Sequence, residues 1–215
     1  MSASCSHHNH SHQHGAAMDG KFRRVLWIAL LVNAAMFVVE LATAQTAASV
    51  SLLADSVDFL GDAINYGLSL FVLSLTLVAR SRVALLKGAS MLLLGLWVIG
   101  QAAWHAWTGV VPEPATMGVV GFLALVANLG VAVLLFAHRE GDSNRRSVWL
   151  CTRNDAIGNV AVLVAAAGVF GTGTGWPDII VAGLMALLAL HSGWQVVRLA
   201  LREMRGDALA HAPAE

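Results

Sequence analysis

The sequence predicts an all-α fold: a polytopic membrane protein with six transmembrane helices and both termini in the cytoplasm. Three observations support this prediction. Of the 215 residues, 57% are hydrophobic and 12% are charged, whereas about 25% are charged in soluble domains. Several apolar stretches reach the about 20 residues needed to cross a bilayer. Among the loops, only alternate ones contain Lys or Arg, as is typical of the cytoplasmic side of a membrane protein.

The chain divides into three parts: a disordered His-rich leader at 1–20, a transmembrane domain at 21–205 and a short tail at 206–215. The leader is polar throughout, a composition that predicts disorder. The spans are predicted at 25–46, 50–79, 83–107, 116–138, 147–170 and 177–200. The second is longer than a bilayer requires and is expected to tilt or protrude.

Positive charges give the orientation, since Lys and Arg in short loops stay on the cytoplasmic side. They precede the first span, flank the second and fourth turns and end the last span: Lys21, Arg23, Arg24, Arg80, Arg82, Lys87, Arg139, Arg145, Arg146, Arg198, Arg202 and Arg205. The opposite loops contain no Lys or Arg. Both termini are therefore expected inside, which requires an even number of spans. We expect the membrane to be a bacterial inner (cytoplasmic) membrane.

Composition also argues against several functions. The net charge is zero, which gives no support to nucleic-acid binding. No dinucleotide-binding, P-loop or nucleophile-elbow motif stands in a suitable context. An intramembrane enzyme is not expected, because no histidine is placed as a general base beside Cys151 and Asp155. No cofactor is predicted.

Three aspartates in the second span need an explanation, because a charge at mid-membrane costs at least about 2.5–3.5 kcal/mol. Asp55, Asp58 and Asp62 follow at spacings of three and four, which places them on one broad helix face. Their mutual repulsion is removed by protonation or by a bound cation. The spacing therefore fits both a metal and protons.

The fifth span contains a second four-residue pair, Cys151 and Asp155. The two pairs together supply four metal ligands: Asp58, Asp62, Cys151 and Asp155. Three carboxylates and a thiolate suit a tetrahedral zinc-like ion better than magnesium, which prefers six oxygens. The triplet Asp-Ala-Ile occurs at both Asp62 and Asp155, a weak sign of the inverted repeats common in transporters.

Less specific roles remain open for several of these residues. Cys151 can be a small apolar residue of a membrane helix, and Asp55 can pair locally near the outer end. Glu40 in the first span fits either a supporting position on the ion pathway or helix pairing. Arg153 is expected to reach the inner interface or to pair with an acid. The asparagines are expected to form interhelical hydrogen bonds rather than bind metal: Asn33, Asn65, Asn128 and Asn159.

The leader contains clustered histidines at His7, His8, His10, His12 and His14. An expression tag would explain them, but their irregular spacing argues against one. Flexible imidazoles collect zinc, cobalt, nickel or copper, so we interpret the leader as a cytoplasmic metal-gathering segment. Cys5 could assist it.

These stretches resemble the cation diffusion facilitator (cation efflux) family, specifically its transmembrane domain. The segment 37–62, FVVELATAQTAASVSLLADSVDFLGD, looks like that family's first-to-second helix region. The segment 151–165, CTRNDAIGNVAVLVA, is similar to its fifth helix, and 176–204 is similar to its sixth. The resemblance implies a four-ligand site between helices two and five, alternating access, and export of metal driven by protons.

Two features depart from the family pattern. Cys151 stands where the family commonly has His or Asp. The chain also ends soon after Arg205, whereas many members continue into a cytoplasmic dimerisation domain. Any homodimer of this chain is therefore expected to form through its transmembrane helices.

We therefore predict an antiporter that exports a divalent transition metal (Zn, Cd, Co or Ni) in exchange for protons, with spans one, two, four and five around the pathway. Spans three and six are poorer in central polar groups. The expected partners are metal ions, protons and membrane lipid. Alternatives are a transporter of another cation, an importer, and a membrane metal sensor or assembly partner without transport.

Overall fold

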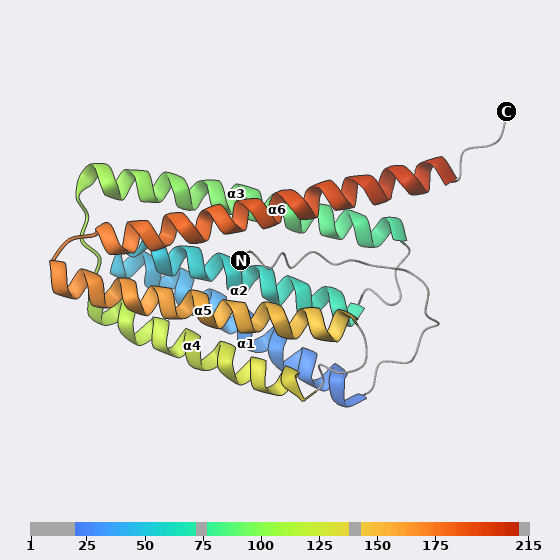
Figure 1. Ribbon diagram of the computed structural model, residues 1–215, viewed down its shortest axis with the longest axis horizontal. Coiled ribbons are helices and arrows are strands. Elements are labelled where there is room, and N and C mark those ends of the chain that lie inside the picture. The colour runs from blue at the N-terminus through green and yellow to red at the C-terminus, as the bar shows by residue number, and fades with distance from the viewer. Residues whose placement is uncertain (1–19, 72–76, 138–142, 211–215) are drawn as a thin grey trace.

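Six α-helices account for nearly all of the described chain (Figure 1). The computed structural model describes residues 20–71, 77–137 and 143–210, and side chains at 20–71, 81–137 and 155–205. Most of the leader therefore lies outside the described residues. The helices are α1 (Gly20–Ala47), α2 (Val50–Phe71), α3 (Leu77–Thr108), α4 (Pro114–Phe136), α5 (Ser143–Thr172) and α6 (Trp176–Ala210).

The predicted membrane fold and its six helices are confirmed. Five of the described helices are long and apolar enough to cross a bilayer: α1, α3, α4, α5 and α6. The remaining helix, α2, carries three aspartates but lies inside the bundle, and most of its residues are buried. Its neighbours shield these aspartates from lipid, which explains how so polar a helix can span the bilayer.

The helix boundaries differ from the predicted ones in two respects. The second span was expected to continue to residue 79, but α2 ends at Phe71 and α3 already begins at Leu77. Residues 72–76 lie outside the described residues, and 77–79 belong to α3 rather than to the second span. At the other end of the chain, α6 continues to Ala210 and so includes residues assigned to the tail.

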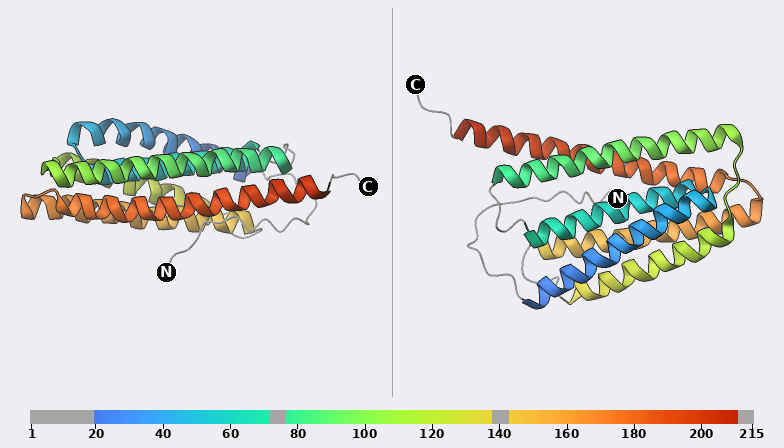
Figure 2. Two further views of the ribbon diagram at one scale, coloured as in Figure 1. Left: turned by 90° about the horizontal axis from the view of Figure 1, so that it is seen from above. Right: turned by 180° about the vertical axis from the view of Figure 1, so that it is seen from behind.

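The helices run alternately up and down and form two groups (Figures 1 and 2). The first group is a four-helix bundle, in which α1 packs on α2 and α4 packs on α5. The second group is the pair of α3 and α6, which has the most extensive interhelical contact in the structure. This pair lies against α2 and α5 of the four-helix bundle, and α2 contacts both of its helices.

Glycines allow the close approach of α3 and α6. A Cβ atom added at Gly88 would lie 2.7 Å from Val197 Cγ2 and 3.0 Å from the carbonyl oxygen of Gly193. One added at Gly193 would in turn lie 3.1 Å from the carbonyl oxygen of Gly88. Small residues at such crossings let helix backbones meet in membranes, where the hydrophobic effect does not drive association.

The buried apolar residues form two clusters at different positions along the helices: an outer cluster toward the end predicted to lie outside, and an inner cluster toward the end predicted to face the cytoplasm. The outer cluster includes residues of all six helices, among them Leu52, Val98, Met117 and Val162. The inner cluster has its described members on α1, α2 and α4 only, with Phe22 and Tyr66 as its largest residues. The described part of the inner cluster therefore lies where α1, α2 and α4 meet.

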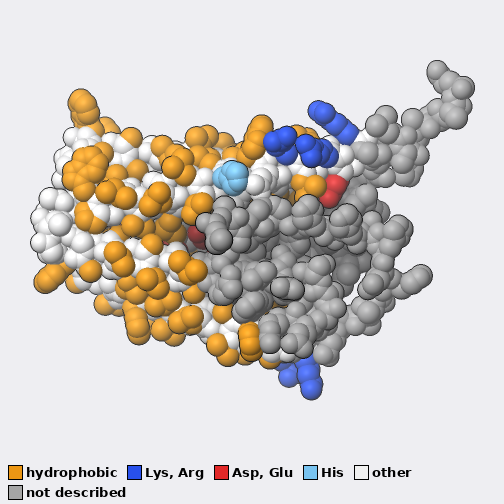
Figure 3. All heavy atoms as spheres, viewed as in Figure 1, with side chains coloured by type: hydrophobic (Ala, Val, Ile, Leu, Met, Phe, Trp, Pro, Cys, Tyr) orange, Lys and Arg blue, Asp and Glu red, His pale blue; other side chains and the backbone are white. Residues whose placement is uncertain are grey.

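Positive side chains gather at one end of the bundle, where α1 begins and α6 ends (Figure 3). The exposed members of this group are Lys21, Arg23, Arg24, Arg82, Arg198, Arg202 and Arg205. The described turns at the other end contain no Lys or Arg. This distribution agrees with the predicted orientation, in which the positive end faces the cytoplasm.

Candidate metal centre

The acidic face of α2 lies inside the bundle. Asp55 is 2% exposed and Asp62 is 9% exposed, while Asp58 between them is partly buried. Their spacing turns all three toward the neighbouring helices rather than toward lipid. The hydroxyl of Tyr66, one turn after Asp62, donates a hydrogen bond of 3.3 Å to Asp62 Oδ2.

Asp155 of α5 meets this acidic face. The carboxyl groups of Asp62 and Asp155 are close enough to share a hydrogen bond, and Asp58 lies within electrostatic range of both. Asp155 is partly buried, and its Oδ2 atom has no hydrogen-bond partner. Three of the four predicted ligands therefore share the interface between α2 and α5.

The two helices run in opposite directions (Figure 1). The matching triplets that begin at Asp62 and Asp155 consequently approach each other from antiparallel helices. This is the arrangement expected of an inverted repeat.

The fourth predicted ligand, Cys151, belongs to helix α5 one turn before Asp155, but its side chain lies outside the described residues, as does that of Arg153. Within the part of the chain whose side chains are described, no three His, Cys, Asp or Glu residues are already arranged as a metal cage. The ligand assignment therefore remains a prediction.

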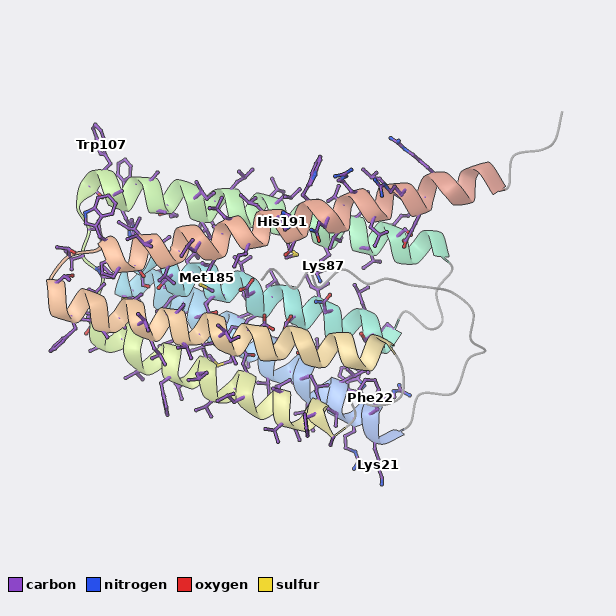
Figure 4. The ribbon with its side chains drawn as sticks, viewed as in Figure 1. Lys21, Phe22, Lys87, Trp107, Met185 and His191 are labelled. Carbon is purple, nitrogen blue, oxygen red and sulfur yellow. The ribbon has the colours of Figure 1, made fainter. Side chains whose placement is uncertain are left out.

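Sequence reasoning did not anticipate the role of Lys87 near this site. It was counted among the cations that flank the second turn, at the start of the predicted third span, but its side chain is 9% exposed and donates a hydrogen bond from Nζ to Asn65 Oδ1 of α2. Figure 4 labels Lys87 between α3 and α2. Its ammonium group interacts with Asp62 and Asp155, so α3 contributes a positive charge beside the acidic pair. The signal that could have revealed this role is a cation inside a predicted span, because ionisable residues within membrane helices pair with one another.

A second polar cluster lies one helical turn farther out. Asn128 Nδ2 of α4 donates to Asn159 Oδ1 of α5 at 2.8 Å, and Asn159 Nδ2 donates to Asp55 Oδ2 of α2 at 2.6 Å. Asp55 thus pairs across the bundle rather than locally. Glu40 of α1 completes the cluster; it is 0% exposed and close enough to Asp55 to share a hydrogen bond.

The predicted interhelical role of the asparagines is confirmed for three of them, Asn65, Asn128 and Asn159. Asn33 is the exception, because its Nδ2 donates to the carbonyl oxygen of Ala29 in its own helix, at 2.8 Å. The cluster draws one residue from each of α1, α2, α4 and α5. These are the four helices expected around the pathway.

Asp178 was also missed as a structural residue. It is 0% exposed in the first turn of α6 and accepts hydrogen bonds from the start of α2. The donors are Ser49 Oγ at 2.7 Å, the Val50 amide at 2.8 Å and the Ser51 amide at 3.0 Å. A carboxylate at a helix N-terminus satisfies amides that have no partner within the helix. Asp178 therefore ties the outer end of α2 to α6.

Comparison with known proteins agrees with this architecture. Residues 26–204 match the family described as the cation efflux transmembrane domain. The cadmium, cobalt and zinc/H(+)-K(+) antiporter of Bacillus subtilis is 25% identical over 207 residues, covering 89% of this chain and 64% of that protein.

Two further relatives have similar identity and coverage. The zinc transporter ZitB of Escherichia coli is 25% identical over 211 residues, with 91% and 67% of the two chains covered. The metal cation efflux system protein CzcD of Cupriavidus metallidurans is 24% identical over 204 residues, with 89% and 63% covered. The chain thus spans about two thirds of the length of these curated relatives. The match over 26–204, on a bundle with paired acidic helices, shows that the chain belongs to the cation efflux family.

Proposed function

We propose that this protein exports a zinc-like divalent metal ion (Zn, Cd, Co or Ni) from the cytoplasm across the bacterial inner membrane in exchange for protons. The observation that supports this most directly is the meeting of Asp62 and Asp155 from antiparallel helices within a cation efflux domain. Two buried carboxylates repel each other, and a divalent cation is well suited to neutralise them. The names of the relatives point to the same class of substrate.

The proposed ligands are Asp58, Asp62, Cys151 and Asp155. Asp58 and Asp62 are one helical turn apart on α2, and Cys151 and Asp155 are one turn apart on α5. Three carboxylates and one thiolate provide a four-ligand set, which is the number that zinc prefers. The thiolate favours softer ions such as cadmium over magnesium or calcium.

Access to this site is proposed from the cytoplasmic side. Asp58 and Asp155 are partly exposed. Glu40 and Asp55, which lie one turn closer to the outer surface, are fully buried. The outer apolar cluster, which joins all six helices, separates the site from the outer surface. Such a difference between the two halves is expected of an inward-open state of an alternating-access transporter.

Exchange with protons follows from the chemistry of the ligands. Carboxylates and a thiolate must lose their protons before they bind metal, so metal binding releases protons and proton binding releases metal. In the proposed cycle the inward-open site loses protons and takes metal. The outward-open site then takes protons and releases metal.

Two further parts of the proposal concern partners. The His-rich leader is proposed to collect metal in the cytoplasm, and its residues up to 19 lie outside the described structure. Any homodimer is proposed to form through the transmembrane helices, whose lipid-facing sides carry exposed Leu, Val and Phe side chains.

The proposal is tested by metal flux in proteoliposomes under an imposed pH gradient, with zinc, cadmium, cobalt and nickel compared. Asp58→Ala is expected to reduce flux about 100-fold, because even a residue that only supports a metal ligand contributes about 10–100-fold. Cys151→Ser is expected to reduce cadmium flux more than cobalt or nickel flux, since sulfur favours the softer ion. Glu113→Ala, at an exposed acid outside the bundle interior, is the control and should leave flux unchanged.

Unchanged flux in Asp58→Ala would contradict the ligand assignment. Stoichiometric metal binding without flux in the intact, folded protein would instead support a metal sensor or assembly partner. Metal flux without opposing proton flux would contradict the exchange.

A further inference from the structure

Glu40, Asp55, Asn128 and Asn159 form a polar cluster that is sealed from solvent. Their exposed fractions are 0%, 2%, 2% and 0%. Each comes from a different helix of the four-helix bundle, α1, α2, α4 and α5 in that order. The cluster is separate from the proposed metal ligands, since Asp55 lies almost one turn outward from Asp58 along α2.

The hydrogen bonds of the cluster leave acceptors without donors. Donation runs from Asn128 to Asn159 and from Asn159 to Asp55. Both carboxyl oxygens of Glu40, and Oδ1 of Asn128, have no donor. A buried polar atom without a partner costs about 1–3 kcal/mol, and more when it is charged. Two of these atoms belong to the fully buried carboxyl group of Glu40, which a proton or another cation would stabilise.

Glu40 and Asp55 are close enough to share a hydrogen bond, yet an ionised carboxylate can only accept one. A direct link between the two groups therefore requires a proton or another cation. Lys87, the buried cation among the described side chains, bonds Asn65 on the opposite side of Asp58 and does not supply this charge. The other charged groups that face the cluster, Asp58 of α2 and Asp155 of α5, are acids; α4 contributes Asn128.

The atoms offered by the cluster are all oxygens. Carboxylate and amide oxygens suit hard cations, whereas zinc and cadmium favour sites with nitrogen or sulfur. A second divalent metal here would lie close to the metal proposed at Asp58, and two such ions would repel each other strongly. A monovalent ion is repelled less.

We propose that Glu40 and Asp55 bind a monovalent cation, either a proton or an alkali metal ion, at a site separate from the metal ligands. Asn159 orients Asp55, and Asn128 Oδ1 is a further ligand when the ion is an alkali metal. The inference rests on the proposed function in one respect: this cation is the counter-ion that the transported metal displaces. Metal at Asp58 repels a cation at Asp55, so each weakens the binding of the other, and the coupling is reciprocal.

The test is calorimetric titration of zinc into the purified full chain, with Glu40→Gln compared with the intact protein. Titrations in buffers of different ionisation enthalpy count the protons released per zinc ion. The same titrations in sodium, potassium and choline chloride reveal competition by alkali ions. Glu113→Gln makes the same chemical change at an exposed position and is the matched control.

If the site holds a proton, the intact protein should release about one proton more per zinc ion than Glu40→Gln. If it holds an alkali metal ion, the proton counts should agree, and sodium or potassium should weaken zinc binding in the intact protein but not in Glu40→Gln. Equal proton counts together with equal salt dependence would overturn the proposal.

A second measurement does not depend on metal binding or transport. Infrared difference spectra of the protein on pH change, and on exchange of choline for sodium or potassium, report carboxyl groups that gain a proton or a cation. A carboxyl signal that Glu40→Gln removes and Glu40→Asp restores supports the site even if the protein moves no metal. Its absence in the folded intact protein overturns the site, while the proposed metal transport would stand or fall by the flux experiment.

Discussion

The four-helix bundle and the α3–α6 pair are held together in different ways. Across the bundle, hydrogen bonds join buried polar groups of different helices, as between Asn128 and Asn159. The α3–α6 pair relies on direct backbone approach at Gly88 and Gly193. Its described polar contact lies near the cytoplasmic end, where Ser81 donates to Glu203 at 2.7 Å.

This difference matches different tasks. Polar groups that bind and release ions must exist within the bundle, and their burial is tolerated because they satisfy one another. A glycine-packed pair has few directional bonds within the membrane and can move as a unit against its neighbours. Asp178 and Lys87 connect the two groups. Movement of the α3–α6 pair would therefore be transmitted to the four-helix bundle through these two residues.

The largest expected effect on stability is at Asp178, which joins the two groups. Asp178→Ala leaves two buried amides and one hydroxyl without their acceptor, and we expect the free energy of unfolding to fall by at least about 2 kcal/mol. Unfolding in mixed detergent micelles measures it. Glu113→Ala, an acid before α4 that makes no cap hydrogen bond, should change it by less than about 0.5 kcal/mol. Equal effects of the two variants would mean that the connection between α2 and α6 has no special importance.

An intermediate effect is expected at the glycine contact. Gly88→Ala places a Cβ atom against Val197 and Gly193, which should cost about 1–3 kcal/mol of unfolding free energy. Gly100→Ala is the matched change on the same helix, where an added Cβ meets nothing within 4 Å. It should be neutral or stabilising by up to about 1 kcal/mol. Equal stability of the two variants would show that close backbone approach does not hold the pair together.

The smallest effect is expected within the bundle. Asn128→Ala removes one interhelical hydrogen bond, for which we expect about 0.6–1.7 kcal/mol. Asn33→Ala is the control, because Asn33 is equally buried but bonds only within its own helix. Both substitutions leave a cavity of the same size, so the difference between them reports the interhelical hydrogen bond. A larger loss for Asn33→Ala, measured by the same unfolding assay, would contradict the importance assigned to bonds between helices.

Much of the fold could be predicted from the sequence. The apolar stretches gave six helices, and the positions of Lys and Arg gave an arrangement with both ends on the same side. The end of α2 was misjudged because residues 72–79 are as apolar as the helix before them. Hydropathy alone does not show where one apolar helix ends and the next begins.

The candidate site was predictable in part. Spacing along single helices identified Asp58 with Asp62, because residues four apart share a helix face. The partnership of Asp55 with Asn159 and Glu40 was not predictable, since it joins three helices that are far apart in the sequence. The contact of Lys87 with Asn65, and its position beside Asp62 and Asp155, were not predictable either, since they depend on how α3 packs against α2.

The sequence by itself determined the number of helices, their alternation and the acidic positions inside the membrane. These are local properties, set by hydropathy and by the 3.6-residue period of the helix. Only the tertiary structure decided which polar groups meet: Asp62 with Asp155, Asp55 with Asn159, and Asp178 with the start of α2. The physical reason is that lipid and the neighbouring helices are both apolar, so hydropathy leaves the rotation of each helix about its axis undetermined. The contacts between helices fix that rotation.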